Sequence, residues 1–201
     1  MERKERQRAE LRETILAAAR RIFLQDGFEG LTMRKIAEAI EYSPGTLYLY
    51  FESREQIAMQ LVREGFEALG AALRPTVAIA DSIERLHALA IAFIDYALNN
   101  TETYKLMMME DAKYVYAAFV PTGDETEIEA GEQAFAILRD AVTAALADGT
   151  LRPIDPTFAA QAFWAGMHGA IALHVTCTDT IEDPRAVALL VADSMVAGLR
   201  A

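Results

Sequence analysis

The stretch Thr32–Phe51, TMRKIAEAIEYSPGTLYLYF, predicts two short helices with a tight turn between them. Thr32 has the hydroxyl that suits a helix N-cap, and Ser43 followed by Pro44 marks a second helix start. In the first helix the apolar residues recur at spacings of three and four positions, which places them on one buried face. They are Met33, Ile36, Ala37 and Ile40. The pattern is that of a helix-turn-helix whose second helix, 43–51, faces outward.

The outward face of this second helix carries residue types that suit a DNA surface. Gly45 allows backbone to approach closely, and Thr46, Tyr48 and Tyr50 carry hydroxyls for phosphate oxygens. Leu49 offers an apolar surface to a thymine methyl group. The alternative is an ordinary helical hairpin in which Leu49 belongs to the core.

The run Ser43-Pro44-Gly45-Thr46-Leu47-Tyr48, followed by Tyr50-Phe51, resembles the recognition-helix signature of the TetR (tetracycline-repressor-like) family of transcription regulators. The resemblance covers about residues 8–60 and extends to Gly27-Phe28, Leu31-Thr32, Ile36-Ala37 and Arg54. It implies a DNA-binding domain of three helices and a basic phosphate contact at Arg54. Arg54 follows a capping serine, so its cation stands where a bound phosphate would be favoured.

One departure from the family pattern lies in the turn, where the family often has glycine and then a small apolar residue. This chain has Glu41-Tyr42 there, and a glutamate in a left-handed conformation costs on the order of 1 kcal/mol relative to glycine. Arg34, Gly45 and Leu49 are the expected base readers. The complete set of predicted DNA contacts is Thr32, Arg34, Ser43, Gly45, Thr46, Tyr48, Leu49, Tyr50 and Arg54.

Net charge and cysteine content indicate which partners and which cellular compartment suit the protein. The 201 residues carry a net charge of −11, but residues 1–54 hold 10 Lys or Arg against 9 Asp or Glu. The acidic excess therefore lies outside the motif. Non-specific affinity for DNA should still be modest, and binding should be sensitive to salt. The single cysteine, Cys177, and a charged N-terminus without an apolar core predict a cytoplasmic protein.

Hydrophobic periodicity predicts an all-α chain with no strand of useful length. A frayed arm at 1–8 precedes the first helix, which ends at Gly27. We expect an N-terminal three-helix, helix-turn-helix DNA-binding domain at 1–54 and a helical effector-binding and dimerisation domain at 55–201. The helices are expected at about 9–25, 32–40, 43–51, 54–73, 81–99, 101–109, 114–119, 125–147, 156–175 and 184–199.

Large apolar and amphipathic side chains in the second domain predict a cleft for a small hydrophobic effector. The alternative is an ordinary core, which large apolar residues at helical spacing more often indicate. The candidate ligand contacts are Phe93, Tyr96, Tyr104, Met107, Met108, Phe119, Phe135, Trp164, Met167 and His168.

Trp164 and His168 lie one turn apart on one helix face, and His168 is followed by Gly169. This arrangement resembles the Trp-His-Gly signature of one C-terminal domain class of TetR-like regulators, and Tyr104-Lys105-Leu106 and Leu173 fit it as well. The resemblance implies an effector-binding domain without naming the effector. The alternative for His168 is a hydrogen-bonded core histidine.

Other kinds of site have weak support. His174 and Cys177 are one turn apart, but two such ligands alone are a weak signal, so we expect no metal. No phosphate loop or nucleophile motif occurs, so neither an enzyme nor a cofactor is expected. The uncharged stretch 158–178 reaches membrane-spanning length, but its histidines, glutamine and small residues favour a buried helix and no membrane partner.

A short recognition helix reads few base pairs, so specific binding needs two half-sites and a dimer. The TetR resemblance implies a homodimer through helices 156–175 and 184–199. The leading hypothesis is a ligand-responsive transcription regulator, a repressor released from a palindromic double-stranded operator by a small hydrophobic effector. The alternatives are a small-molecule binding protein with a vestigial helix-turn-helix, and a helical enzyme.

Overall fold

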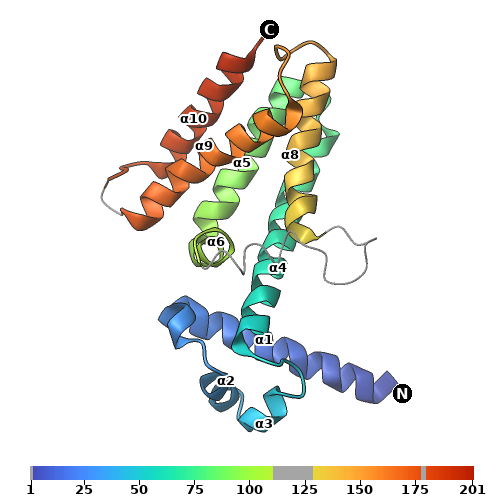
Figure 1. Ribbon diagram of the computed structural model, residues 1–201, viewed down its shortest axis with the longest axis vertical. Helices are drawn as coiled ribbons and strands as arrows, with labels where there is room; N and C mark the ends of the chain where they lie inside the picture. Colours follow the sequence, from blue (N-terminus) through green and yellow to red (C-terminus); the bar gives the residue numbers. More distant parts are fainter. Residues whose placement is uncertain (1, 111–128, 178–179) are drawn as a thin grey trace.

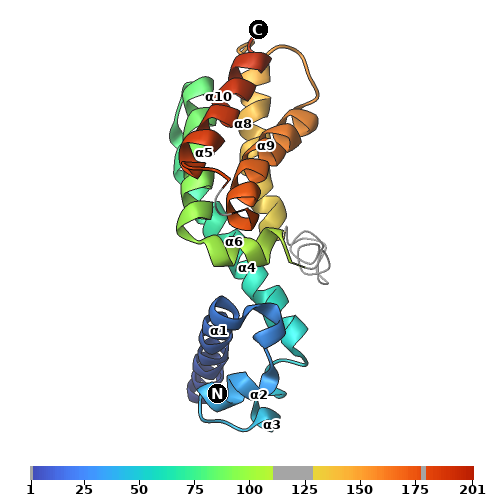
Figure 2. The same cartoon turned by 90° about the vertical axis from the view of Figure 1, so that its left-hand side faces the viewer.

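The computed structural model describes residues 2–110, 129–177 and 180–201, and these residues form helices joined by short turns (Figure 1). The N-terminal part contains α1 (Glu2–Gly30), α2 (Met33–Ala39) and α3 (Pro44–Leu47). The long helix α4 (Arg54–Leu73) leads from them into the second part of the molecule. Figure 2 shows the N-terminal helices below the bundle, with α4 running from one to the other.

The second part is a helical bundle. Its elements are η1 (Arg74–Ala78), α5 (Ser82–Asn99), α6 (Thr101–Met108), α8 (Ala130–Ala147), α9 (Pro156–Thr176) and α10 (Pro184–Leu199). Among the described residues there is no strand, and the one bridge joins Leu151 to Arg200. The all-α prediction is confirmed, with a helix-turn-helix unit followed by a bundle.

Side-chain caps begin the helices where the sequence predicts them. The Thr32 hydroxyl accepts a hydrogen bond from the backbone N–H of Lys35 at 3.2 Å, and the Ser43 hydroxyl accepts one from Thr46 at 3.2 Å. Each bond satisfies an N–H group that has no partner inside the helix. Further caps of the same type are supplied by Ser53, Asp81, Asp155 and Asp183.

The N-terminal arm is one place where the structure differs from the prediction. Residues 2–8 are the first turns of α1 rather than a frayed arm. Arginine, lysine, glutamate and glutamine are all strong helix formers, so the charged composition of this segment favours a helix. At the other end, Gly27 interrupts α1 with φ 66° and ψ −171°, and helical geometry resumes as far as Gly30.

Three other boundaries differ. The second helix of the motif is regular only over Pro44–Leu47, because Leu49 and Tyr50 then bond to carbonyls three residues back and tighten the chain into a turn. Helix α6 has Asn100, not Thr101, at its N-cap position. Helix α8 begins at Ala130 after the extended residue Glu129. The predicted helix at 114–119 and residues 125–128 lie outside the described residues.

Helix α4 belongs to both halves of the molecule. It packs on α1 and also on α5, α6 and α8. Its buried residues Ile57 and Leu61 lie in its first turns, whereas Phe66, Leu69 and Leu73 lie toward the bundle. The division at residues 54 and 55 therefore stays a prediction, since the helix that starts there continues through both parts.

The uncharged helix α9 packs against α8 and α10 in the bundle. In the described ranges of the chain, no helix combines the length and the apolar character that crossing a bilayer requires.

Candidate functional site

Helix α3 is held by its two apolar anchors and leaves its other face open. Leu47 is fully buried and Phe51 is 2% exposed, whereas Tyr48 is 55% exposed and Leu49 is 71% exposed. A side chain added at Gly45 would meet only the Ser43 hydroxyl within 4 Å, at 3.7 Å. The predicted sidedness of this helix is therefore confirmed, and its open face combines a bare backbone, a phenol and a leucine.

The hydroxyls at the start of α3 are used locally. The Ser43 hydroxyl accepts from the Thr46 backbone N–H and lies 3.0 Å from the Thr46 hydroxyl. Tyr50, which was predicted beside Tyr48, is half-buried instead, and the Arg8 guanidinium lies 5.9 Å from the centroid of its ring. Tyr50 thus contacts α1 as well as the motif.

Helix α2 contributes one exposed cation to this surface. The Arg34 side chain is 83% exposed, and its Nε donates to Glu38 Oε1 at 2.8 Å. This hydrogen bond with Glu38 raises the pKa of Arg34, so the guanidinium remains charged at any physiological pH. Thr32 lies at the N-cap of the same helix, where its hydroxyl already accepts from Lys35.

Arg54 has internal partners as well as its predicted position in the first turn of α4. Its guanidinium carbon lies 4.6 Å from the centroid of the Phe28 ring, and Nη1 donates to the Leu31 carbonyl at 3.3 Å. Its Nε donates to Glu55 Oε1 at 3.1 Å. The side chain therefore joins α4 to the end of α1, and its predicted phosphate contact stays a prediction.

The turn between α2 and α3 has the strain that its sequence predicts. Glu41 has φ 60°, the only positive φ among the described non-glycine residues. The next residue, Tyr42, donates its backbone N–H to the Ala37 carbonyl at 2.9 Å, and its side chain is 48% exposed. The chain thus has a glutamate in a left-handed conformation, which glycine would adopt at lower cost.

The bundle encloses a narrow apolar cavity of about 40 Å³. Half of the predicted ligand contacts line it, namely Phe93, Met108, Phe135, Trp164 and Met167. The Phe135 and Trp164 rings meet at a centroid distance of 5.7 Å. The residues that the prediction missed are Phe66, Leu69, Leu73, Leu89, Gly131, Ala134 and Leu138.

Three of the cavity residues that the prediction missed lie on α4. Phe66, Leu69 and Leu73 recur at spacings of three and four, so they form one wall of the cavity from a single helix face. The periodicity in the sequence was sufficient to find this face. It could not reveal that the face borders a cavity rather than close-packed core.

Four other predicted ligand contacts do not line the cavity. Tyr104 is fully buried, and its hydroxyl lies 2.7 Å from Nδ1 of His168. Burial raises the pKa of the Tyr104 phenol and lowers the pKa of His168, so both groups are held neutral and share one hydrogen bond. This geometry matches the core-histidine alternative. The Tyr96 hydroxyl instead contacts the Gly65 carbonyl of α4 and Sδ of Met107. Phe119 is outside the described residues.

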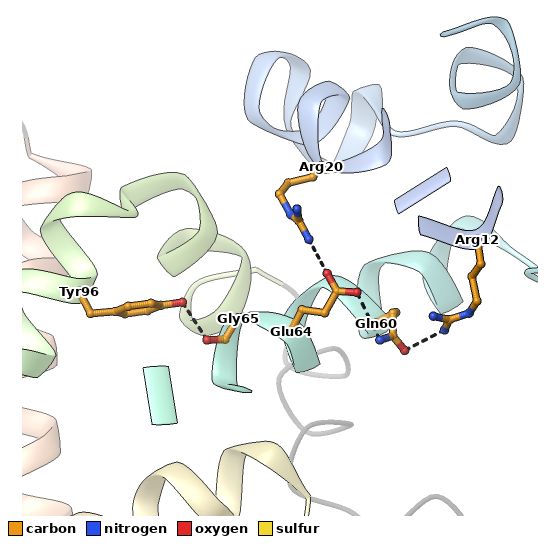
Figure 3. A network of polar contacts seen from close by, with 6 residues as sticks. All are labelled: Arg12, Arg20, Gln60, Glu64, Gly65 and Tyr96. Atoms are coloured by element: carbon orange, nitrogen blue, oxygen red, sulfur yellow. Dashed lines mark hydrogen bonds and ion pairs between the residues drawn. The ribbon is translucent and has the colours of Figure 1, made fainter. Parts of the chain in front are cut away.

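A polar network joins the motif-bearing helices to the bundle along α4 (Figure 3). Arg12 of α1 donates to Gln60 at 3.1 Å, and Arg20 of α1 pairs with Glu64. Arg12 also lies 4.9 Å from the centroid of the Phe51 ring, at the end of the motif. These contacts join α1 and the end of the motif to α4.

Two family models match the chain. The model described as "Bacterial regulatory proteins, tetR family" matches residues 15–61, and the model described as "Tetracyclin repressor-like, C-terminal domain" matches residues 86–195. The second description does not specify the Trp-His-Gly class, so that assignment stays a prediction.

Two curated relatives each match part of the chain. The HTH-type transcriptional regulator UidR of Escherichia coli K12 is 34% identical over 89 residues, which is 44% of this chain and 40% of UidR. The HTH-type transcriptional repressor AcnR of Corynebacterium diphtheriae is 38% identical over 53 residues, which is 26% of this chain and 28% of AcnR. The matches thus span less than half of either relative.

Solved structures match over nearly the whole length. A protein with unknown function from Rhodococcus sp. RHA1 is 28% identical with a TM-score of 0.78, covering 95% of this chain and 96% of that one. The TetR family transcriptional regulator PfmR from Thermus thermophilus has the same fold, with 21% identity, a TM-score of 0.69 and coverage of 93% and 99%. Because the C-terminal family model alone covers more than half of its residues, the chain belongs to the TetR family of bacterial regulatory proteins.

Proposed function

We propose that the protein is a homodimeric, ligand-responsive transcription regulator of the cytoplasm that represses from a palindromic operator. The main observation for DNA binding is the open face formed by α3 and the turn that follows it. Tyr48 and Leu49 are exposed there, while Leu47 and Phe51 are buried. Membership of the TetR family supports the same function, as does the partial similarity to the HTH-type regulators UidR and AcnR.

The residues of this surface have different roles in the proposed complex. Gly45 and Leu49 approach base edges in the major groove, and Arg34 reaches them from α2. The hydroxyls of Thr46 and Tyr48 bind phosphate oxygens. Thr32, Ser43, Tyr50 and Arg54 act at the edge of the surface. Their contacts within the protein fix the shape of the motif and leave hydrogen-bonding capacity for phosphate.

The proposed dimer is formed by α9 and α10 of two protomers. Large apolar side chains are exposed on these helices, and water-exposed clusters of this kind mark association sites. They are Phe158 at 69% exposed, Leu173 at 51%, Leu190 at 66% and Val187 at 38%. Sedimentation velocity should give a dimer for the native chain and a monomer for Leu190→Asp, with operator affinity lost in the monomer.

The proposed effector is a small hydrophobic molecule that enters the apolar cavity. Because Phe66, Leu69 and Leu73 form one wall of this cavity, an occupant displaces α4 and with it the two recognition helices of the dimer. The cavity of about 40 Å³ holds only a few water molecules, so the effector must open it. By linkage, DNA and effector weaken each other's binding by the same factor.

The decisive experiment is selection of DNA from a random-sequence pool, followed by fluorescence anisotropy with the enriched sequence. We expect a palindrome and a Kd that rises steeply with salt. Leu49→Ala should cost about 1–2 kcal/mol of binding free energy, because it removes apolar contact with a base. Val77→Ala is a matched control, since this exposed residue lies in the bundle. A pool without an enriched sequence would overturn the proposal.

The second candidate is a small-molecule binding protein whose helix-turn-helix is vestigial. The net charge of −11 and the strained Glu41 in the motif favour it. This reading excludes salt-dependent binding to a palindrome, so the same anisotropy experiment separates the two functions.

A further inference from the structure

A second hollow, the outer pocket, lies next to the apolar cavity and has a volume of about 120 Å³. Its walls come from η1, α5 and α8, which pack against one another at the end of the bundle away from α1. Figure 1 shows α5 and α8 side by side in this part of the molecule. The wall residues include Thr76, Val77, Arg85, Leu89, Ile137 and Asp140.

The outer pocket continues the apolar cavity by one helical turn on each wall. The cavity residue Leu73 is followed three positions later by Thr76 of the outer pocket, and on α8 Leu138 is followed three positions later by Ala141. Residues at this spacing lie one above the other on a helix. On α5, Leu89 lines both hollows and is 2% exposed. The Leu89 side chain is therefore a wall that the two hollows share.

The outer pocket reaches the molecular surface. Val77 is 55% exposed, and Asp140 is exposed as well. In contrast, all the described residues that line the apolar cavity are buried or half-buried. A molecule from solvent can thus enter the outer pocket first and reach the cavity by displacing Leu89, which changes between rotamers without moving the backbone.

The outer pocket contains one cation and one anion, on opposite walls. Arg85 of α5 donates from Nε to the Ile79 carbonyl at 2.7 Å, and its Nη2 lies 3.5 Å from the Ala80 carbonyl. These bonds hold the guanidinium in place and leave Nη1 available. Asp140 of α8 has no hydrogen bond or ion pair with any residue that the structure describes. The pocket therefore offers both a donor and an acceptor.

The charges near Arg85 determine which head group suits the outer pocket. A hydrogen bond from the Ser82 hydroxyl lowers the pKa of Asp148, and the positive charge of Arg85 adds to this shift. Arg85 thus already interacts with a carboxylate outside the pocket. A carboxylate head group would be repelled by Asp140, and an ammonium head group by Arg85. A neutral hydroxyl can accept from Arg85 and donate to Asp140.

We propose that the outer pocket and the apolar cavity form one site for a linear molecule with a neutral polar head group, such as a medium-chain alcohol, and that Leu89 is the gate between them. The head group lies between Arg85 and Asp140, and the apolar chain passes Leu89 toward Trp164. Arg85 and Phe93 are eight residues apart on α5, or about 12 Å, which suits the length of decanol. The inference rests on the proposed effector response and names the class of its ligand.

The first test compares decanol, decanoate and decylamine, which share one chain length and differ in charge at neutral pH. Titration followed by Trp164 emission gives the Kd of each, because Trp164 lines the apolar cavity. Decanol should bind at least about tenfold more tightly than either charged probe. A charged probe that binds as tightly as decanol would overturn the assignment of the head group.

Substitutions of Asp140 test where the head group lies. Asp140→Ala removes the acceptor and the repulsion, so decanol should bind about fivefold more weakly and decanoate about fivefold more tightly. Asp140→Asn keeps an acceptor oxygen without the charge, so decanol should keep its affinity within about twofold while decanoate gains.

The matched control is Glu84→Ala, which removes the same charge from an exposed residue of α5 that does not line the outer pocket. It should change neither Kd. An effect equal to that of Asp140→Ala would assign the change to net charge and overturn the inference.

Substitutions of Leu89 test the gate by the rate at which decanol changes Trp164 emission after rapid mixing. Leu89→Ala removes the shared wall and should raise the association rate about tenfold. Leu89→Met conserves the core volume, so it retains the fold, and its flexible side chain should raise the rate several-fold. Ile137→Met, in the outer pocket but not in the cavity, should leave the rate unchanged. A native rate in both Leu89 variants would overturn the gate.

Two further outcomes separate this inference from the proposed function. If decanol does not alter the emission of the native chain, the proposed effector cavity and the inference both fail. If decanol binds and the Asp140 variants bind all three probes as the native chain does, the inference fails while the effector cavity stands. A chain that shows the expected ligand effects and binds no DNA would overturn the proposed regulator and retain the two-part site.

Discussion

The hydroxyl of Tyr96, on α5, donates a 2.8 Å hydrogen bond to the backbone carbonyl of Gly65, midway along α4 (Figure 3). The same hydroxyl lies 3.6 Å from Sδ of Met107, on α6. The residue before Gly65, Glu64, pairs with Arg20 of α1. One turn of α4 therefore contacts α1 through Glu64 and the bundle through Gly65. Burial raises the pKa of Tyr96 to about 12, which keeps its hydroxyl a donor.

Glycine at position 65 is required by the packing of α6. A methyl group there would lie 2.5 Å from Sδ of the fully buried Met107 and 3.2 Å from Thr103. We expect Gly65→Ala to lower the free energy of unfolding by about 1–3 kcal/mol, with the flexible methionine keeping the cost toward the lower end. Equilibrium denaturation in urea would measure it.

Gly70 provides the control, since it is in the same helix and also buried. Its added methyl group would lie 4.0 Å from the Ala134 side chain, an ordinary contact. Gly70→Ala should therefore stabilise the protein by about 0.5–1 kcal/mol through helix propensity. If both alanines shifted stability in the same direction, the close approach of Met107 would not be what requires Gly65.

The turn of the motif gives a second prediction. Glu41 has φ 60°, which costs a side-chain-bearing residue about 1 kcal/mol relative to glycine. Glu41→Gly should therefore raise the free energy of unfolding by roughly that amount. Glu41→Ala removes the same charge and keeps the strain, so the gain should be absent. An equal gain in both variants would assign the effect to charge rather than to backbone geometry.

The local signals in the sequence were sufficient for helix starts and for the sidedness of α3. Ser43 and Asp155 cap their helices because a cap is a contact between residues three positions apart. Leu47 and Leu49 take opposite environments because a helical period separates their directions.

The contacts between distant segments could not be found in this way. Trp164 and His168 share a helix face, yet Trp164 lines the cavity while His168 bonds to Tyr104. Spacing specifies a direction, whereas the partner on that side depends on how other helices pack. The same reason applies to Arg54, whose partner Phe28 is 26 positions away in the sequence and leaves no local pattern.

The Tyr104–His168 pair predicts a dependence of stability on pH. Burial lowers the pKa of His168 below the 6.5 of an ordinary histidine. The unfolded chain therefore takes up a proton at a higher pH than the folded chain, so stability is complete above about pH 6.5 and falls as the pH drops through the folded pKa. Thermal unfolding of the native chain between pH 7.5 and pH 5 should show this loss.

The variant His168→Gln isolates this contribution from that of the other titrating groups. Glutamine can still bond to the Tyr104 hydroxyl but does not titrate, so its melting temperature should fall less between the same two pH values. Equal slopes for the native chain and the variant would show that His168 does not contribute to the acid sensitivity.

The last prediction concerns the cavity, where the chain's single tryptophan is a built-in reporter. Trp164 lines the cavity and contacts Phe135, so an apolar molecule that enters it should change the tryptophan emission. Titration with decanol, followed by tryptophan emission, measures this binding directly.

Ala134→Val adds two carbons to the cavity wall and should weaken decanol binding about tenfold, since filling a site of about 40 Å³ removes the space that the probe needs. Ala39→Val makes the same exchange on α2, away from the bundle, and should leave decanol binding unchanged. Equal weakening by both substitutions, or an emission that decanol does not alter, would remove the cavity as the binding site.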